Sequence, residues 1–404
     1  MKERIVKKID TSKRNFLTGS VTLAGVAAAT SVLPISIAKA NHEDSDPKGL
    51  PNFIKWKKRS ALIIHSKKTM ESHRGAVGSS VITPIRHIYI RNNMPSMTDA
   101  QIGDRSKWKV KIEGVKNPKT FTLAQLKRMG QTTIATVLQC SGNGRGFFPH
   151  KPRGSQWRTG AAACVMWTGC PITTVVEACG GIASGTKYIT ATGVDHVPTG
   201  LDPKKATVER SLPKKAHKDA ILAWEMNGVP LPNAHGGPLR FISPGYFGIN
   251  NVKHLGKLAF TAEESSVKYM KSSYRISPIG KKGSQYPTCW EMPVKSYITS
   301  PLKSAKSGDV VISGVAFGGT KKVGKIKVST DGGKTWNKAK FVGPNLGKYA
   351  WRQFVYKTNL ESGTYNIASK ASAGGKSQPE LRTENRRGYA HNGWFDHSLN
   401  IKIV

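Results

Sequence analysis

The sequence has few acidic residues and lacks the common motifs for nucleotides and metals. Its 404 residues include 24 Asp and Glu against 63 Lys and Arg, a formal net charge of +39. It contains no P-loop, no GxGxxG opening a helix after a strand, no HExxH, no GxSxG, no CxxC and no CxxCH. These absences exclude the usual signatures of nucleotide hydrolysis, dinucleotide binding, zinc or esterase catalysis, iron–sulfur clusters and covalent haem.

The excess of positive charge favours anionic partners, which include nucleic acid, acidic proteins, membrane surfaces and small oxyanions. The basic residues are spread evenly along the chain and no recognition motif accompanies them, so we expect no nucleic-acid partner. The 38% of hydrophobic residues is typical of a soluble globular protein. The length allows two or more domains.

The first forty residues are typical of an export signal. A basic stretch is followed by the apolar residues 21–37 and by a small-residue cleavage site, Ala38–Ala40. The apolar stretch is too short and too weakly apolar for an integral membrane span. "SKRNFL" (Ser12–Leu17) is similar to the twin-arginine pattern with Lys13 in place of the first arginine, although an ordinary secretory signal is the alternative. We expect a periplasmic protein, exported folded through the twin-arginine route.

The remaining chain divides into three regions. Residues 41–80 form an N-terminal lead-in, and residues 81–290 alternate short strands and helices, which predicts an α+β catalytic domain. Within it, Thr122 predicts the N-cap of a helix that buries Leu123 and Leu126 and ends at Gly130. Residues 291–404 alternate at period two around turns such as Asp331-Gly332-Gly333, and predict an all-β immunoglobulin-like sandwich.

One cysteine has unusual surroundings. The five cysteines are odd in number and irregularly spaced, which argues against a disulfide framework. Cys164, Cys170 and Cys179 lie among small and apolar residues and are expected to pack in the core. Cys140 instead ends an apolar run and precedes a glycine-rich turn and Arg145. It is either a nucleophile, for which His150 is the nearest histidine, or a ligand for a soft or high-valent metal.

The stretch "VLQCSGNGRGFF" resembles the cysteine loop of the sulfite oxidase family, in which the cysteine binds molybdenum carried by molybdopterin. The resemblance continues in order over roughly residues 80 to 404, and "VSTDGGKTW" and "NRRGYAHNGW" are similar to the family's dimerisation domain. The other matching stretches are "IYIRNNMP" with Arg91, "SQWRTGAAACVMWTG" with Trp157, "LAWEMNGVPLPNAHGGPLRFISPGYFGINNVKHLGKL" with His235, Arg240 and Lys253, and "SSYRISP" with Tyr274.

The resemblance assigns roles to these residues. Cys140 would bind the metal, and Arg91, Arg145 and Arg153 would form a cationic pocket for sulfite. Tyr274 would donate a hydrogen bond there and Trp157 would wall the pocket. The pterin and its phosphate would be held by Arg91, Asp195, His235, Arg240 and Lys253. Without the resemblance, these residues have ordinary structural interpretations. Trp157 could be a core residue, and His235 could be a loop histidine. Asp195 could be a turn residue that caps a strand, and Tyr274 alone would be weak evidence for an active site.

The implied activity is oxidation of sulfite to sulfate by oxygen-atom transfer. No cytochrome b5-like domain precedes the catalytic domain, so we expect no haem in this chain and a separate c-type cytochrome as acceptor. The dimerisation domain implies a homodimer. The alternatives are a sulfane dehydrogenase acting on carrier-bound sulfur, a methionine sulfoxide reductase and a non-enzymatic anion-binding protein. The sequence departs from the family pattern at two positions. Asn93 puts in doubt one contact near the cofactor or substrate, and Asp396 puts in doubt one wall of the pocket.

Overall fold

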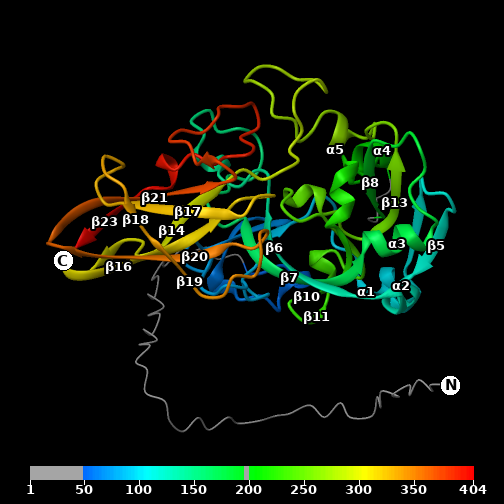
Figure 1. The fold of residues 1–404 in the computed structure, drawn as a ribbon, viewed down its shortest axis with the longest axis horizontal. Helices are drawn as coiled ribbons and strands as arrows, with labels where there is room; N and C mark the ends of the chain where they lie inside the picture. Colours follow the sequence, from blue (N-terminus) through cyan, green and yellow to red (C-terminus); the bar gives the residue numbers. More distant parts are fainter. Residues whose placement is uncertain (1–48, 195–199) are drawn as a thin grey trace, which may run out of the picture. The chain divides into compact units, whose positions relative to one another are not determined.

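A computed structural model describes residues 49–194 and 200–404, which combine short helices with five β-sheets. Three sheets lie within residues 62–261 and two within residues 295–403. Figure 1 shows the strands from β14 onward gathered in the yellow, orange and red part of the ribbon. The predicted fold class, an α+β region followed by an all-β sandwich, is confirmed.

One sheet leads the chain to Cys140. It has the strand order β11-β10-β7-β6, with β12 paired to β10. Strands β6 and β7 pair antiparallel from Thr132↔Gly169 to Gln139↔Ala162, so the last residue of β6 is held in register immediately before Cys140. The strands are β6 (Thr132–Gln139), β7 (Ala162–Pro171), β10 (Ile221–Met226), β11 (Val229–Pro230) and β12 (Arg240–Ile242).

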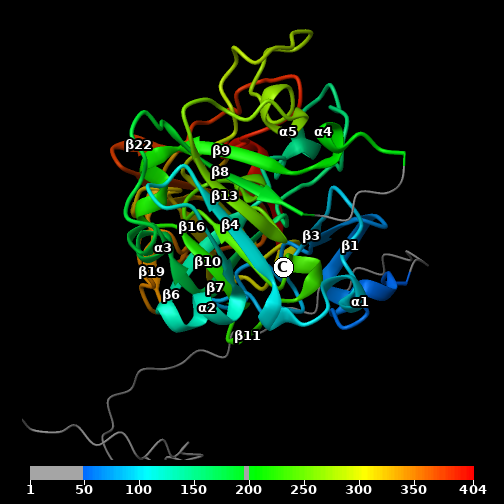
Figure 2. The same ribbon diagram turned by 90° about the vertical axis from the view of Figure 1, so that its right-hand side faces the viewer.

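A second sheet has the order β5-β4-β13-β8-β9, and Figure 2 shows β4, β13, β8 and β9 side by side. A third, small sheet has the order β1-β2-β3. Its last strand ends at Arg91, one of the predicted site residues. The strands are β1 (Leu62–Ser66), β2 (Thr69–Ser72), β3 (Ile90–Arg91), β4 (Lys109–Glu113), β5 (Lys119–Thr122), β8 (Tyr188–Gly193), β9 (Glu209–Pro213) and β13 (Leu255–Thr261).

The helices are short. The predicted helix is confirmed as α2, where the Thr122 side chain accepts from the backbone N–H of Gln125 and the Gln125 side chain accepts in return. Leu123 and Leu126 are buried as predicted, and Gly130 is the C-cap. No described helix is both long enough and apolar enough to span a membrane. The helices are α1 (Asp99–Ile102), α2 (Leu123–Met129), α3 (Ile172–Ala178), α4 (Pro203–Ala206) and α5 (Lys268–Lys271).

The C-terminal strands form two sheets, β14-β16-β20-β19 and β15-β23-β21-β17-β18, with β22 paired to β21. Their facing apolar residues, among them Ile312, Phe354 and Ile367, form one buried core. The predicted turn after β17 is confirmed, with Gly332 and Gly333 at φ values of +75° and +96°. The strands are β14 (Lys295–Ser300), β15 (Ser304–Ala305), β16 (Gly308–Phe317), β17 (Val323–Ser329), β18 (Asn337–Lys338), β19 (Lys340–Val342), β20 (Arg352–Leu360), β21 (Gly363–Ala373), β22 (Lys376–Ser377) and β23 (Leu399–Ile403).

The sandwich contacts the sheet that carries Cys140. The backbone N–H of Val137 in β6 donates to the carbonyl of Tyr349 at 2.8 Å. Val137 and Phe247 also share a buried cluster with Tyr297 and Trp351 of the sandwich. The strand before Cys140 is therefore supported from both regions of the protein.

Candidate active site

Cys140 lies in a loop whose shape is fixed by hydrogen bonds. Its backbone N–H donates to Ala161 at 2.9 Å, and its carbonyl accepts from Asn143 at 2.9 Å. The Asn143 side chain donates to Gln139 and accepts from the backbone N–H of Ala161, both at 3.1 Å. The turn is thus held by its own buried amide, and Cys140 remains only partly buried, unlike Cys164, which is fully buried.

Two glycines in this loop are required for different reasons. Gly144 has a φ of +103°, a conformation that side chains with a Cβ rarely adopt, and a Cβ there would lie 2.4 Å from the His391 ring. A Cβ on Gly142 would lie 2.6 Å from the guanidinium of Arg145. Gly142 therefore makes room for the Arg145 guanidinium, and Gly144 allows both the turn and the close approach of the segment that carries His391.

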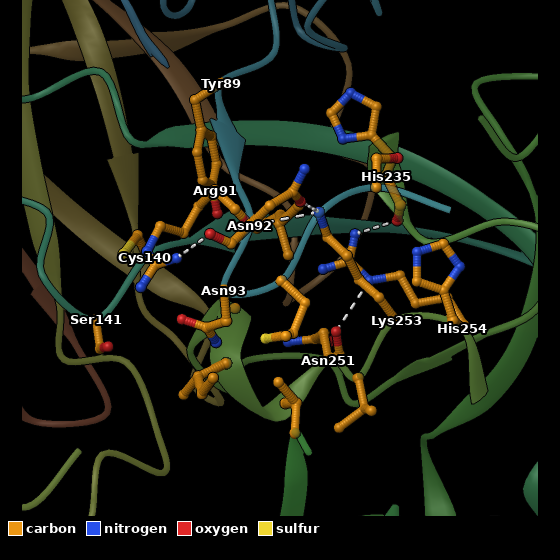
Figure 3. Close-up of a pocket in the computed structure, with 18 of the residues that line it drawn as sticks. Tyr89, Arg91, Asn92, Asn93, Cys140, Ser141, His235, Asn251, Lys253 and His254 are labelled. Carbon is orange, nitrogen blue, oxygen red and sulfur yellow. Dashed lines mark hydrogen bonds between the residues drawn. The ribbon is translucent and has the colours of Figure 1, made fainter. Parts of the chain in front are cut away.

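Two cavities meet at Cys140. We call the one that also includes His235, Arg240 and Lys253 the inner cavity, and the one that includes Arg145 the outer cavity. In the close-up of the inner cavity, Cys140 and Ser141 lie on one side and His235 and His254 on the other (Figure 3). Four residues line both cavities: Arg91, Asn93, Cys140 and Tyr274.

The inner cavity is basic and rigidly built. Arg240 donates to the carbonyls of Asn251 at 2.9 Å and His235 at 2.8 Å, and Lys253 donates to the Asn92 side chain at 2.5 Å. Burial lowers the pKa of Arg240 to about 10, which leaves it charged at neutral pH. Burial, together with the positive charges of Lys57, Lys253 and Arg240, lowers the pKa of His235 well below its usual value. His235 is therefore neutral, with one ring nitrogen able to accept and the other to donate.

Several buried polar atoms of the inner cavity have no hydrogen-bond partner within the described residues. They are Asn92 Nδ2, Ser96 Oγ, Ser141 Oγ and His235 Nε2. Buried polar groups are nearly always paired, so unpaired atoms around one cavity indicate a polar ligand. Such a ligand would have several hydrogen-bonding edges and an anionic group for Arg240 and Lys253. A pterin with a phosphate has both.

The outer cavity is lined by cations. Arg145 is 7% exposed, and two of its five N–H groups donate to backbone carbonyls, of Arg387 at 2.8 Å and Ser155 at 3.2 Å. Its guanidinium lies 5.3 Å from the centre of the Tyr389 ring. The remaining donors have no partner among the described residues. The five lining cations are Arg91, Arg145, Arg153, Lys268 and Arg387, and no described residue that lines this cavity is acidic.

Arg91 and Tyr274 lie where the two cavities join. Burial by itself would lower the pKa of Arg91, but the nearby Tyr274 and Cys140 outweigh it and raise the pKa, so this guanidinium stays charged. Tyr274 has a φ of +57°, which is strained for a residue with a Cβ. Its ring stacks on Tyr389 with 5.3 Å between centroids. The strained backbone and the stacking together fix the phenol beside Cys140.

The structure places Trp157 elsewhere than predicted. Its side chain is fully buried and lines neither cavity. Its ring contacts His65, with 5.0 Å between centroids, and Tyr89, with 6.2 Å. Tyr89 does line the inner cavity, so Trp157 supports the wall from the core. Asp195, predicted to contact the pterin, lies outside the described residues.

Three other sequence expectations can be compared with the structure. His150, the base that a nucleophilic Cys140 would use, lies 3.6 Å from Glu384 and lines neither cavity. Asp396 also lies outside both cavities, and its carboxylate binds Arg382 and His391, each at 2.7 Å. Its charge is therefore neutralised and does not oppose an anion at Cys140. Asn93, the other departure, does line both cavities.

Sequence reasoning missed several residues that line the outer cavity, among them Lys268, Arg387 and Tyr389. Arg387 and Tyr389 belong to the segment "NRRGYAHNGW", which was assigned only to the dimerisation domain. The structure brings this segment to the cysteine loop, where Ala390 N–H donates to the Ser141 carbonyl at 2.9 Å. The signal available in the sequence was a pair of arginines beside an aromatic residue.

Residues 97–269 match the family model described as oxidoreductase molybdopterin binding domain, and residues 286–402 match the one described as Mo-co oxidoreductase dimerisation domain. The chain is 30% identical to mitochondrial sulfite oxidase of Rattus norvegicus over 80% of its own length and 62% of that protein's, and 28% identical to sulfite oxidase of Arabidopsis thaliana over 80% and 89%. It spans about three fifths of the length of the mammalian relatives.

A solved structure, the sulfane dehydrogenase SoxCD from Paracoccus pantotrophus, matches with a TM-score of 0.70 and 25% identity, over 90% of this chain and 95% of that one. The chain belongs to the sulfite oxidase family of molybdopterin-dependent oxidoreductases. The inner cavity fits the cofactor of that family, because it offers a thiol, cationic groups for a phosphate and unpaired polar atoms for a pterin.

Proposed function

We propose that this protein oxidises sulfite to sulfate with a molybdenum–molybdopterin cofactor and passes the electrons to an external c-type cytochrome. One observation carries the proposal. The thiol of Cys140 lies where a cavity that fits a pterin meets a cavity lined by five cations. The family and its sulfite oxidase members support the coarser statement, molybdenum-dependent oxidation of a sulfur compound.

Each part of the inner cavity has a task in holding the cofactor. Cys140 would bind the metal as thiolate, because a metal ion deprotonates a thiol that coordinates it. Arg240 and Lys253 would hold the phosphate, and neutral His235 would pair with the pterin through its unpaired Nε2. When bound, the cofactor supplies the transfer of an oxygen atom to sulfur.

The outer cavity would bind and orient sulfite. Arg91 and Arg145 present forked N–H donors that match the geometry of an oxyanion. Arg145 is held by two backbone carbonyls and by the Tyr389 ring, so little side-chain entropy is lost when the anion binds. Tyr274 would donate a hydrogen bond from its hydroxyl group to an oxygen of sulfite. The cavity has a volume of about 240 Å³, enough for a small oxyanion, since a cavity that holds one water molecule needs only about 10–15 Å³.

Electrons would leave through a second protein. Without residues 1–40 the chain keeps 56 Lys and Arg against 22 Asp and Glu, a formal net charge of +34, which attracts an acidic partner; this attraction weakens as salt screens it. A small acidic c-type cytochrome fits this requirement. The match to a dimerisation domain supports a homodimer. Residues 1–40, which lie outside the described residues, support export to the periplasm by the twin-arginine route.

A second candidate is a sulfane dehydrogenase that acts on carrier-bound sulfur. It is favoured by the similarity to SoxCD over 90% of the chain. The two candidates differ in the substrate that must reach Cys140, a free anion in one case and the arm of a carrier protein in the other.

Two measurements on the purified protein test the proposal. Elemental analysis should find about one molybdenum per chain. Sulfite should reduce cytochrome c catalytically, and much faster than thiosulfate does. Protein that contains no molybdenum when expressed in a host that makes the cofactor would overturn the proposal. If carrier-bound sulfur reduces cytochrome c in the presence of the enzyme and sulfite does not, the second candidate is correct.

A further inference from the structure

The outer cavity carries more positive charge than one sulfite ion needs. Sulfite brings a charge of about −1 to −2, whereas Arg91, Arg145, Arg153, Lys268 and Arg387 all line this cavity. Like charges gathered in one cavity repel one another, and no described residue that lines it is acidic. The excess indicates that the cavity can bind a second negative group in addition to one sulfite-sized anion.

Within the outer cavity, solvent exposure separates two deep cations from two at the mouth. Arg91 borders both cavities, and Arg145 is only 7% exposed, so both lie deep, beside Cys140. Arg153 and Lys268 are exposed, which places them at the mouth of the outer cavity. Neither of these two side chains has a hydrogen-bond or ion-pair partner in the part of the chain that the structure describes.

Both mouth cations stand on anchored backbone. The Gln156 side chain donates to the carbonyls of Pro152 at 2.8 Å and Gly154 at 2.9 Å, which closes the loop around Arg153. Lys268 is the first residue of α5, and its carbonyl accepts from the N–H groups of Ser272 and Ser273. Two separate segments thus present one unpaired cation each to the same cavity.

We propose that Arg153 and Lys268 form a second anion subsite, which binds the distal negative group of a substrate whose reacting sulfur lies at Cys140. The ligand class for this subsite is a small sulfur anion with two separated anionic groups, which the enzyme would accept in addition to sulfite. Sulfite alone occupies only the deep part, between Arg91 and Arg145. This inference deepens the proposed function and depends on it for the position of the reacting sulfur.

A general positive field could also attract anions to the mouth without a defined subsite. Two probes of equal charge separate these cases, because long-range attraction depends on charge and a subsite depends on spacing. The probes are sulfate, a compact dianion, and 1,2-ethanedisulfonate, an extended one. Titration calorimetry on the molybdenum-loaded enzyme should show that the disulfonate binds about tenfold more tightly than sulfate.

The variants Arg153→Gln and Lys268→Gln should each reduce this preference severalfold, and the double variant should remove it. Lys338→Gln is the matched control, since Lys338 is an exposed lysine of β18 that lines neither cavity. Equal affinities for both probes in the natural protein, or an equal loss for both probes in the variants, would overturn the subsite.

The outcomes separate this inference from the proposed function. A preference for the disulfonate in a protein that does not oxidise sulfite would contradict the proposed function and leave the subsite standing. Sulfite oxidation by a protein that binds both probes equally would support the proposed function and contradict the subsite.

Discussion

Lys295, the first residue of β14, donates a hydrogen bond to the backbone carbonyl of Asn143 at 3.3 Å and so joins the sandwich to the loop that carries Cys140. The same ammonium group donates to the carbonyl of His391 at 2.9 Å. Lys295 is fully buried, and burial lowers its pKa to about 7 despite the opposing attraction of Asp396. A single side chain therefore links the cysteine loop to the C-terminal segment that completes the outer cavity.

This buried lysine makes stability depend on pH. With a pKa of about 7 in the folded protein against 10.5 in the unfolded chain, the unfolded state binds more protons between these values. The free energy of unfolding of the natural protein should therefore rise, relative to Lys295→Met, as the pH increases from about 7 to 10. Urea unfolding of both proteins at pH 6.5, 8 and 9.5 measures this. Lys338→Met should show no such trend, and a constant difference at all three pH values would contradict the prediction.

Replacement of Cys140 should abolish sulfite oxidation without unfolding the protein. In Cys140→Ser, the hydroxyl is a poor substitute for the thiolate, while the loop keeps its backbone hydrogen bonds to Ala161 and Asn143. We expect no measurable turnover and a melting temperature within about 4 °C of the natural protein. Steady-state assays and circular dichroism check both statements. Cys164→Ser is the control for loss of a thiol, and undiminished turnover in Cys140→Ser would exclude the ligand role.

Removal of the charge at the junction of the cavities should weaken substrate binding. Arg91→Gln deletes a charged donor to the anion, a loss of about 1.5–3 kcal/mol. The KM for sulfite should therefore rise about tenfold or more, with a smaller change in kcat. Arg91→Lys retains the charge but not the forked N–H donors, so its KM should lie between those of the natural protein and Arg91→Gln. An unchanged KM in Arg91→Gln would mean that this arginine does not face the substrate.

Substitution of Gly144 should destabilise the protein more than substitution of a comparable glycine. Gly144→Ala adds a clash with the His391 ring to the strain of a positive φ, whereas Gly130, at φ +125°, has nothing within 4 Å of an added Cβ. Strain alone costs about 1–3 kcal/mol. Gly130→Ala thus measures the strain, and Gly144→Ala should lose more free energy of unfolding in urea titrations. Equal losses would show that the His391 segment moves away freely.

Local patterns in the sequence were sufficient for much of the fold. Thr122, Leu126 and Gly130 predicted α2 correctly, because capping and periodicity act within one turn of the chain. The turn at Asp331 was also correct, although β18 is limited to Asn337–Lys338 because the following residues pair with β20 in the other sheet. That change of sheet depends on long-range packing, which has no local signature.

The site was only partly predictable for the same reason. Arg91, Cys140 and Tyr274 were found in separate matching stretches, and the structure brings them to one junction. Trp157 was assigned to the cavity wall, but whether a tryptophan faces a cavity or the core depends on neighbours such as Tyr89 that are distant in sequence. Arg387 was missed because it approaches Arg145 from 242 positions further along the chain.

The contact between Arg145 and the Arg387 carbonyl also bears on biosynthesis. During translation, the loop that contains Arg145 is synthesised long before the segment that contains Arg387. The outer cavity therefore lacks its C-terminal residues until translation has passed that segment. A ribosome that stalls after β20 would release a chain that contains every residue lining the inner cavity but lacks Arg387 and Tyr389 of the outer cavity.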